Sequence, residues 1–201
     1  MVRKILTAVL ASVVAVSLSF GAPKLVIPKA EAPKTEAPKL EITSWLKPGN
    51  VMVNVGLHYS YLGLGAGGGI EWIFAEIKVA DILPFQFGVA ARGFADLLPW
   101  YSYGMGFGVG GMVTGHFSIK SLKLGISFVD NVDFYIGLGA GLTIAPGFNN
   151  TYYGYWNPTG VNFWSSDGVS YFLSDNFALF AEYNYHGGWN QGGTLGVMLK
   201  I

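Results

Sequence analysis

The sequence predicts an all-β protein, an antiparallel up-and-down transmembrane β-barrel. Repeated alternation of apolar and polar residues, an apolar composition without a later spanning helix, and an N-terminal export signal support this fold class. In residues 51–61, every odd position is large and apolar or aromatic, and every even position except Met52 is small or polar. Since successive strand side chains point to opposite faces, the segment has one apolar and one polar face. Its length suits a tilted strand that crosses a bilayer, which needs roughly 9 to 11 residues.

The composition fits a protein that exposes apolar side chains to lipid. Hydrophobic residues make up 51% of the chain and charged residues only 12%, with 29 glycines. Beyond the N-terminal segment, no stretch approaches the roughly 18 apolar residues of a spanning helix. A closed barrel can show this apolar surface to lipid because its backbone groups pair between strands. The chain has no cysteine, which excludes disulfides, thiol chemistry, thiolate metal sites and a lipid-modified N-terminal cysteine.

The N-terminus has the organisation of a secretory signal peptide. Arg3 and Lys4 precede an uncharged apolar run, and Ser19-Phe20-Gly21 offers a small-x-small cleavage site. We therefore predict a signal peptide at residues 1–21, with an uncleaved anchor helix as the alternative. Export followed by a barrel predicts a location in the bacterial outer membrane, with outer-membrane lipid as the surrounding partner.

Residues 22–48 differ in composition from the rest of the chain. Pro23, Pro28, Pro33 and Pro38 recur at a spacing of five, which favours an extended, solvated segment. We predict a disordered periplasmic arm, with Trp45 at the membrane interface. Five lysines and three glutamates give the arm a net charge of +2, whereas residues 49–201, the predicted barrel, carry a net charge of −4. Neither charge indicates a nucleic-acid partner. The arm at residues 22–46 is either a spacer or a contact for cell-wall polymer or a periplasmic partner.

The alternating pattern predicts eight strands, an even number that suits antiparallel closure. It places the N-terminal arm and the C-terminus on the same, periplasmic, side. Residues 118–132 are long for a periplasmic turn, and an extra hairpin there would make ten strands. The extracellular connections are then residues 62–67, 96–102, 145–160 and 187–191. The predicted strands are residues 51–61, 66–78, 85–95, 103–117, 133–144, a sixth ending at 168–173, 177–186 and 192–201.

The polar faces of these strands define a predicted lumen network. An eight-stranded barrel is just wide enough for its own side chains, so inward charged groups should pair with one another. Glu71 and Arg92 lie on adjacent strands at similar heights and are our predicted ion pair, with Glu182 joining from across the lumen. We favour the interpretation that this network is a polar plug that fixes the barrel's geometry. A proton or ion path is the alternative. The network comprises Glu71, Arg92, Glu182, His58, His116, Asp133 and His186.

Aromatic residues collect near the predicted strand ends, where amphipathic rings favour the headgroup region. The predicted girdle contains Tyr59, Tyr61, Phe117, Phe134, Tyr171 and Tyr185, with Trp164 also placed at the outer rim. The longest extracellular loop, residues 145–160, has a composition common in binding loops and equally in interfacial belts. Its candidate contacts with an extracellular ligand are Asn149, Tyr152, Tyr153, Tyr155 and Trp156.

A resemblance to a known family comes from the segment Gly168-Val169-Ser170-Tyr171-Phe172-Leu173-Ser174-Asp175-Asn176 and the following residues 177–185. These residues resemble the penultimate hairpin of the small outer-membrane barrels of the OmpA/OmpX type. The resemblance implies an eight-stranded barrel with a plugged interior, whose members stabilise the envelope, adhere to hosts or resist surface attack. The chain departs from the family at its end, where Leu199-Lys200-Ile201 replaces the usual terminal aromatic residue.

Candidate chemistry along the chain is sparse. His58-Tyr59-Ser60 resembles the catalytic pair of outer-membrane lipid A deacylases, in which a base activates a hydroxyl. Here the pair points inward and has no nearby acid in sequence, so two satisfied lumen groups are the simpler interpretation. The three histidines are scattered over three strands, so we predict neither a metal site nor a cofactor. The glycines at every second position from Gly104 to Gly110 indicate a strand's inner face, because no helix follows them as a phosphate-binding loop requires.

These observations predict an outer-membrane barrel with a structural or surface-interaction role, in envelope integrity or adhesion, and no enzymatic activity. A narrow channel for ions or small solutes is the alternative in another class. A lipid-modifying enzyme that uses His58 and Ser60 is a third. A soluble lipocalin-like barrel would need the opposite polarity, with its apolar face inward.

Overall fold

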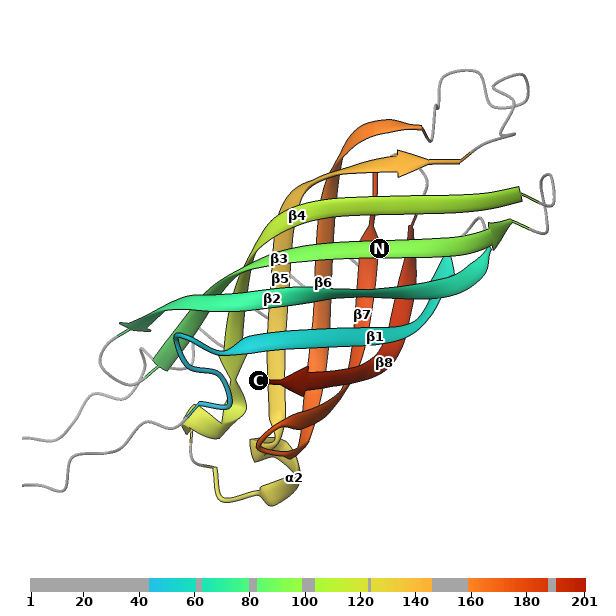
Figure 1. The fold of residues 1–201 in the computed structure, drawn as a ribbon. Helices are drawn as coiled ribbons and strands as arrows, with labels where there is room; N and C mark the ends of the chain where they lie inside the picture. The colour runs from blue at the N-terminus through green and yellow to red at the C-terminus, as the bar shows by residue number, and fades with distance from the viewer. Residues whose placement is uncertain are drawn as a thin grey trace, which may run out of the picture. The chain divides into compact units, whose positions relative to one another are not determined.

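The computed structural model describes residues 44–60, 63–79, 83–98, 104–122, 124–145, 159–187 and 191–201. Eight antiparallel strands each pair with the next in the chain, and the eighth pairs with the first to close a barrel. Figure 1 shows β1, β2 and β3 in front of β5, β6 and β7, which run in a different direction because barrel strands tilt against the axis. The strands are β1 Val51–Ser60, β2 Leu64–Val79, β3 Leu83–Leu98, β4 Gly104–Ser118, β5 Val132–Ile144, β6 Gly160–Ser174, β7 Phe177–Tyr185 and β8 Gln191–Lys200.

The connection between β4 and β5 decides the strand number. It contains a 3₁₀ helix, η1, at Ile119–Leu122 and a short helix, α2, at Ser127–Asp130. Neither the helices nor the other described residues of this connection form the extra hairpin that would have made ten strands. The eight-stranded prediction is therefore confirmed. Within the described part of the chain, no helix is long and apolar enough to cross a membrane.

Over most of the wall, large apolar side chains face outward, and most polar side chains face inward. On β1, Val55 and Leu57 are 58% and 70% exposed, whereas the neighbouring His58 is 1% exposed. β5 alternates in the same way along its whole length. This is the polarity of a barrel that lies in hydrocarbon, and it is opposite to that of a soluble lipocalin-like barrel. The predicted transmembrane barrel is confirmed.

The two ends of the barrel differ in their connections. At the end that holds Val51 and Lys200, the strands are joined through residues 80–82, 119–131 and 175–176. At the opposite end they are joined through residues 61–63, 99–103, 145–159 and 186–190. Outer-membrane barrels have short periplasmic turns and longer extracellular loops. We call the first end the inner end and the second the outer end.

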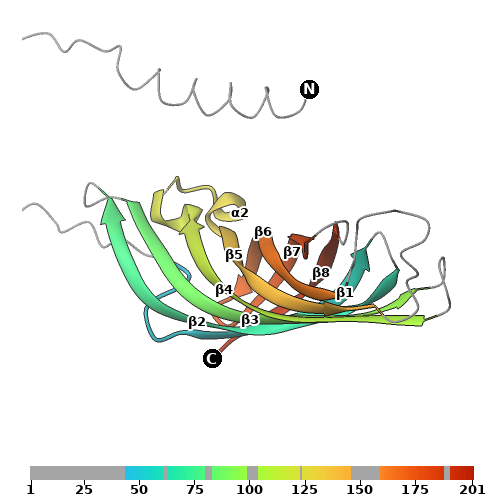
Figure 2. The ribbon, with the colours of Figure 1, turned by 90° about the horizontal axis from the view of Figure 1, so that it is seen from above.

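An irregularity in β2 shifts the faces of this strand near the inner end. The pairing of β2 with β3 slips between Ile73 and Ala75, as at a β-bulge, where one extra residue changes the alternation. Ile73 is fully buried. Ala75, which strict alternation from Glu71 would place on the inward face, instead pairs with Phe87 on the outward row. From above, Figure 2 shows β2 and β3 bending along their length.

Two other positions differ from the sequence prediction. β3 continues to Leu98, so Asp96, which was predicted in an extracellular loop, lies on the strand and is buried. Trp164, predicted at the outer rim, is fully buried inside the barrel. Both errors have the same cause: the alternation continues further toward the outer end than the change in composition suggested.

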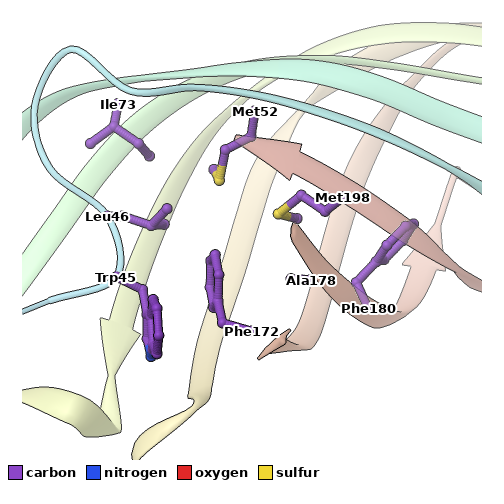
Figure 3. Packing of buried hydrophobic residues seen from close by; sticks show 8 residues of the cluster. All are labelled: Trp45, Leu46, Met52, Ile73, Phe172, Ala178, Phe180 and Met198. Atoms are coloured by element: carbon purple, nitrogen blue, oxygen red, sulfur yellow. The ribbon is translucent and has the colours of Figure 1, made fainter. Parts of the chain in front are cut away.

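An apolar cluster fills the inner end of the lumen (Figure 3). The segment before β1 contributes Trp45 and Leu46, which are 9% and 0% exposed. Residues 22–43 of the predicted arm lie outside the described residues, but its last residues are held by the barrel, because Trp45 and Leu46 bury apolar surface that would otherwise meet water. This corrects the placement of Trp45 at the membrane interface. The cluster consists of Trp45, Leu46, Met52, Ile73, Phe172, Ala178, Phe180 and Met198.

Candidate functional site

A network of charged side chains occupies the middle of the lumen. Arg92 Nη2 on β3 donates to Glu71 Oε2 on β2 over 3.0 Å, and both side chains are almost completely buried. The two residues lie diagonally across the strand pair, two residues apart in register, since Gly69 pairs with Arg92 and Glu71 pairs with Ala90. Glu182 on β7 faces the same guanidinium, with 3.7 Å between its Oε2 and Arg92 Nε. One buried cation therefore bridges two carboxylates from different walls of the barrel.

His116 on β4 extends this network toward the inner end. Its Nε2 lies 2.8 Å from Glu71 Oε1, and its Nδ1 lies 2.9 Å from Asp133 Oδ2 on β5. Thr114 also donates to Glu71. A carboxylate only accepts hydrogen bonds, so a ring that carries a proton on both nitrogens satisfies Glu71 and Asp133 together. The chain of contacts Asp133, His116, Glu71, Arg92 and Glu182 links four neighbouring strands and β7.

Aromatic rings fill the lumen above the charged network. Phe94 stacks on His186 with centroids 4.5 Å apart and on His58 at 5.1 Å. Trp164 contacts both Phe94 and His186. The glycines opposite Trp164 make room for its ring: a methyl group at Gly141 would lie 2.3 Å from Cε2 of Trp164. We call Phe94, His58, His186 and Trp164 the outer aromatic layer.

The acid that the sequence did not place beside His58 and Ser60 is Asp96. Ser60 Oγ donates to Asp96 Oδ2 over 2.8 Å, and His58 Nε2 lies 3.7 Å from the same oxygen. His58 Nδ1 is 2.9 Å from Thr194 Oγ1. In an activated serine the imidazole sits between hydroxyl and acid, whereas here the hydroxyl bonds directly to the acid. All three side chains are also at most 2% exposed. The arrangement is that of a structural hydrogen-bonded group.

A cavity of about 10 Å³ separates the charged network from the outer aromatic layer. Its lining includes His58, Arg92, Glu182 and His186. His58 Nε2, Arg92 Nε, Glu182 Oε2 and His186 Nδ1 have no hydrogen-bond partner among the described residues. A cavity of this size holds roughly one water molecule. The space therefore suits a water that bridges the two layers.

The predicted lumen residues all lie inside the barrel, and the structure brings them into two groups. Glu71, Arg92, Glu182, His116 and Asp133 form the charged network. His58 and His186 lie together in the outer aromatic layer, with ring centroids 5.6 Å apart. Among the described residues, no group of three or more histidine, aspartate or glutamate side chains is arranged to hold a metal ion.

The predicted girdle residues face outward where the structure describes them. Tyr59 at the outer end is 66% exposed, and Phe134 at the inner end is 48% exposed. Phe117 pairs with Phe134, and its ring contacts that of Phe85 at a tilt, with centroids 5.3 Å apart. Tyr171 and Tyr185 are partly exposed on β6 and β7. Tyr61 and the loop residues Asn149, Tyr152, Tyr153, Tyr155 and Trp156 lie outside the described residues.

No protein family model matches the chain, and no curated protein matches it. The attachment invasion locus protein Ail of Yersinia pestis is 16% identical, with a TM-score of 0.47 over 77% of this chain and 100% of that one. Neisserial surface protein A is 17% identical, with a TM-score of 0.41 over 76% of this chain and 95% of that one. The outer membrane enzyme PagL is 13% identical, with a TM-score of 0.43 over 76% of this chain and 99% of that one.

The barrel's own topology carries the fold assignment. Closed antiparallel barrels with an even number of strands, an apolar exterior and a polar lumen are the outer-membrane type, and this chain has all of these features. The predicted likeness to the small OmpA/OmpX-type barrels is confirmed at the level of the eight-stranded fold.

Sequence reasoning missed two residues of the lumen, Asp96 and Trp164. The signal for Asp96 was present, because Arg92, Phe94 and Asp96 continue the inward alternation of β3. The signal for Trp164 was indirect: inward glycines on β4 and β5 leave a space, and the ring of Trp164 on the neighbouring strand β6 fills it.

Proposed function

We propose that the protein is a non-conducting outer-membrane barrel with a structural or surface-interaction role and no enzymatic activity. The observation that supports this proposal is the layered filling of its lumen. The apolar cluster closes the inner end, the charged network occupies the middle, and the outer aromatic layer lies above it. Since side chains occupy all three levels, no continuous water-filled path is expected.

Planar-bilayer recording tests the plug. Wild-type protein should give no stable unitary conductance. A variant with Phe94→Ala and Trp164→Ala opens the outer aromatic layer and serves as the control for insertion, since it should admit ions more readily than wild type. Stable unitary conductance of the wild type would overturn the proposal.

A narrow ion or proton path is the second candidate function. It is favoured by the water-sized cavity between Arg92, Glu182, His58 and His186, which links ionisable groups from the inner to the outer part of the lumen. Proton flux into vesicles loaded with a pH-sensitive dye would support this candidate, provided that Glu182→Gln abolishes it.

The surface-interaction part of the proposal concerns the loop at residues 145–160. Its asparagine, tyrosine and tryptophan side chains are of the kind that binding loops use. Replacing Tyr152, Tyr153, Tyr155 and Trp156 by serine should reduce attachment of expressing cells to a host-cell monolayer and leave surface abundance unchanged. Unchanged attachment would remove this loop as the ligand site.

The arm at residues 22–46 is proposed to contact an anionic cell-wall polymer, because its proline spacing favours an extended segment and its lysines outnumber its glutamates. Co-sedimentation of purified protein with peptidoglycan tests this contact. Replacement of Lys24, Lys29, Lys34 and Lys39 by glutamine should abolish co-sedimentation, and the same replacement of Glu31, Glu36 and Glu41 should not.

A further inference from the structure

The connection between β4 and β5 exposes large apolar side chains at the inner end of the barrel. The described turn between β6 and β7 at the same end is short and polar, with Asp175 and Asn176, as is usual for periplasmic turns. A contiguous set of exposed apolar groups on a protein surface marks an interaction site. The connection patch, as we call this set, comprises Leu122, Leu124, Ile126 and Phe128, which are between 39% and 69% exposed.

The backbone on both sides of the connection patch is held in place. Lys120 Nζ, on η1, lies 3.5 Å from the centre of the Trp45 ring, and Trp45 Nε1 donates to Asp130 O at the end of α2 over 2.8 Å. Phe172 N, on β6, donates to Asn131 O over 2.8 Å. Because η1 and α2 are both tied to the barrel, the exposed position of the patch is built into the fold.

Phe128 joins the connection patch to the lipid-facing wall. Its ring contacts that of Tyr171, with centroids 5.3 Å apart, and α2 lies beside the inner ends of β5 and β6 (Figure 1). Tyr171 is an outward girdle residue that pairs with Val132, the first residue of β5. The outward rows remain apolar at this end, with Phe134 and Leu173 exposed. The patch therefore extends a surface that lipid covers, at the inner girdle.

Backbone chemistry limits how deeply the connection patch can enter the bilayer. In the hydrocarbon region every backbone polar group needs a partner within the protein, so irregular chain does not face lipid there. Between η1 and α2, the described residues 124–126 are irregular. The backbone therefore belongs in the hydrated headgroup layer, from which the apolar side chains reach the acyl chains. Interfacial elements of this kind bury their apolar face about 5 to 10 Å into that boundary.

We propose that the connection patch is an interfacial anchor that binds phospholipid of the inner leaflet, with its backbone among the headgroups and its side chains among the acyl chains. Lipid is the occupant because the contact of Phe128 with Tyr171 makes the patch continuous with the lipid-facing wall. The anchor fixes the depth of the barrel's inner end. It also gives a role to residues 119–131, which are longer than a periplasmic turn requires. The contact is separate from the lumen and goes beyond the function proposed above.

Nitroxide labelling of the full barrel in vesicles of phosphatidylethanolamine and phosphatidylglycerol tests the anchor. The chain has no cysteine, so a single introduced cysteine takes the label alone. Leu124→Cys and Ile126→Cys probe the patch, Phe134→Cys probes the lipid-facing wall, and Asp175→Cys probes the turn at the same end. The two patch labels should be open to oxygen and shielded from a water-soluble nickel chelate, as the label at position 134 is. The label at position 175 should be open to the chelate.

A second variant tests the apolar contact itself. Ile126→Ser combined with Phe128→Ser removes two exposed side chains, so the barrel should still fold. With the label at Leu124→Cys, this change should raise the accessibility to the nickel chelate toward that of the label at position 175. Leu199→Ser is the matched control, because Leu199 is an exposed apolar residue at the inner end of β8, away from the connection. It should leave the label at position 124 unchanged.

Three results would contradict the anchor. Patch labels as open to the nickel chelate as the label at position 175 would show that the patch faces water, as a docking site for a periplasmic protein would. Spin–spin broadening at Ile126→Cys that disappears on dilution with unlabelled protein would assign the patch to a contact between copies of the chain. A label at position 124 that ignores the loss of Ile126 and Phe128 would show that these side chains do not hold the connection in lipid.

Discussion

The ring of Trp45 stacks on the ring of Phe172, with centroids 4.8 Å apart and planes within 3° of parallel. Trp45 comes from the segment before β1, and Phe172 from the inner part of β6. Trp45 Nε1 also donates to Asp130 O over 2.8 Å, and Lys120 Nζ lies 3.5 Å from the centre of its ring. Lys200 Nζ donates to the carbonyl oxygen of Trp45 over 2.8 Å. Trp45 thus joins β6, β8, η1 and α2 at the inner end.

Removing the Trp45 side chain should destabilise the barrel strongly. We expect Trp45→Ala to lower the free energy of unfolding by about 3 to 5 kcal/mol, because it empties space that the apolar cluster cannot refill. Trp45→Phe keeps a stacking ring and loses the hydrogen bond to Asp130, so its cost should be about 1 kcal/mol. Urea unfolding in lipid vesicles measures both. Equal losses for the two variants would show that the stack does not contribute.

The ion pair of Arg92 and Glu71 should show strong coupling. Arg92→Met leaves Glu71 and Glu182 buried without their cation, and we expect it to cost about 3 to 5 kcal/mol of unfolding free energy. Adding Glu71→Gln removes one uncompensated charge, so the double variant should lose less than the sum of the two single variants. A double-mutant cycle by urea unfolding measures the coupling. Additive losses would contradict the network described above.

The space occupied by Trp164 depends on glycine at position 141. Gly141→Ala should destabilise the barrel by about 1 to 3 kcal/mol, because the added methyl group collides with a fully buried ring that cannot move aside. Gly111→Ala is a matched control on the paired strand β4, where the nearest atom is Ala90 O at 3.9 Å. The free energy of unfolding should fall for Gly141→Ala and stay near the wild-type value for Gly111→Ala. If Gly141→Ala is as stable as wild type, the ring of Trp164 does not occupy this space.

Ser60 should affect stability and leave lipid chemistry unaltered. Ser60→Ala removes a donor to the buried carboxylate of Asp96, so the barrel should lose about 1 to 3 kcal/mol of unfolding free energy. Because the hydroxyl bonds to the acid and not to His58, lipid A from cells that express the variant should match that from wild-type cells by mass spectrometry. A change in acylation pattern would support the enzyme hypothesis instead.

The strands could be predicted from sequence because the alternation of apolar and polar residues is contained within each strand. On β4, Phe107, Val109 and Val113 alternate with small or polar residues, and the side-chain period of a strand alone fixes which face is apolar. The pairing of Glu71 with Arg92 could be anticipated too, because adjacent antiparallel strands of similar length bring inward residues of similar height together. Asp96 and Trp164 were misplaced because composition near the outer end changes before the strands stop.

The sequence by itself determined the strand order, the outward apolar face and the set of inward polar residues, since these follow from a local period of two. Only the tertiary structure decided which side chains meet inside the lumen. The stack of Trp45 on Phe172 and the hydrogen bond of Ser60 to Asp96 join residues that are distant in sequence. Such contacts depend on closure and on the stagger between strands, and no local pattern contains that information.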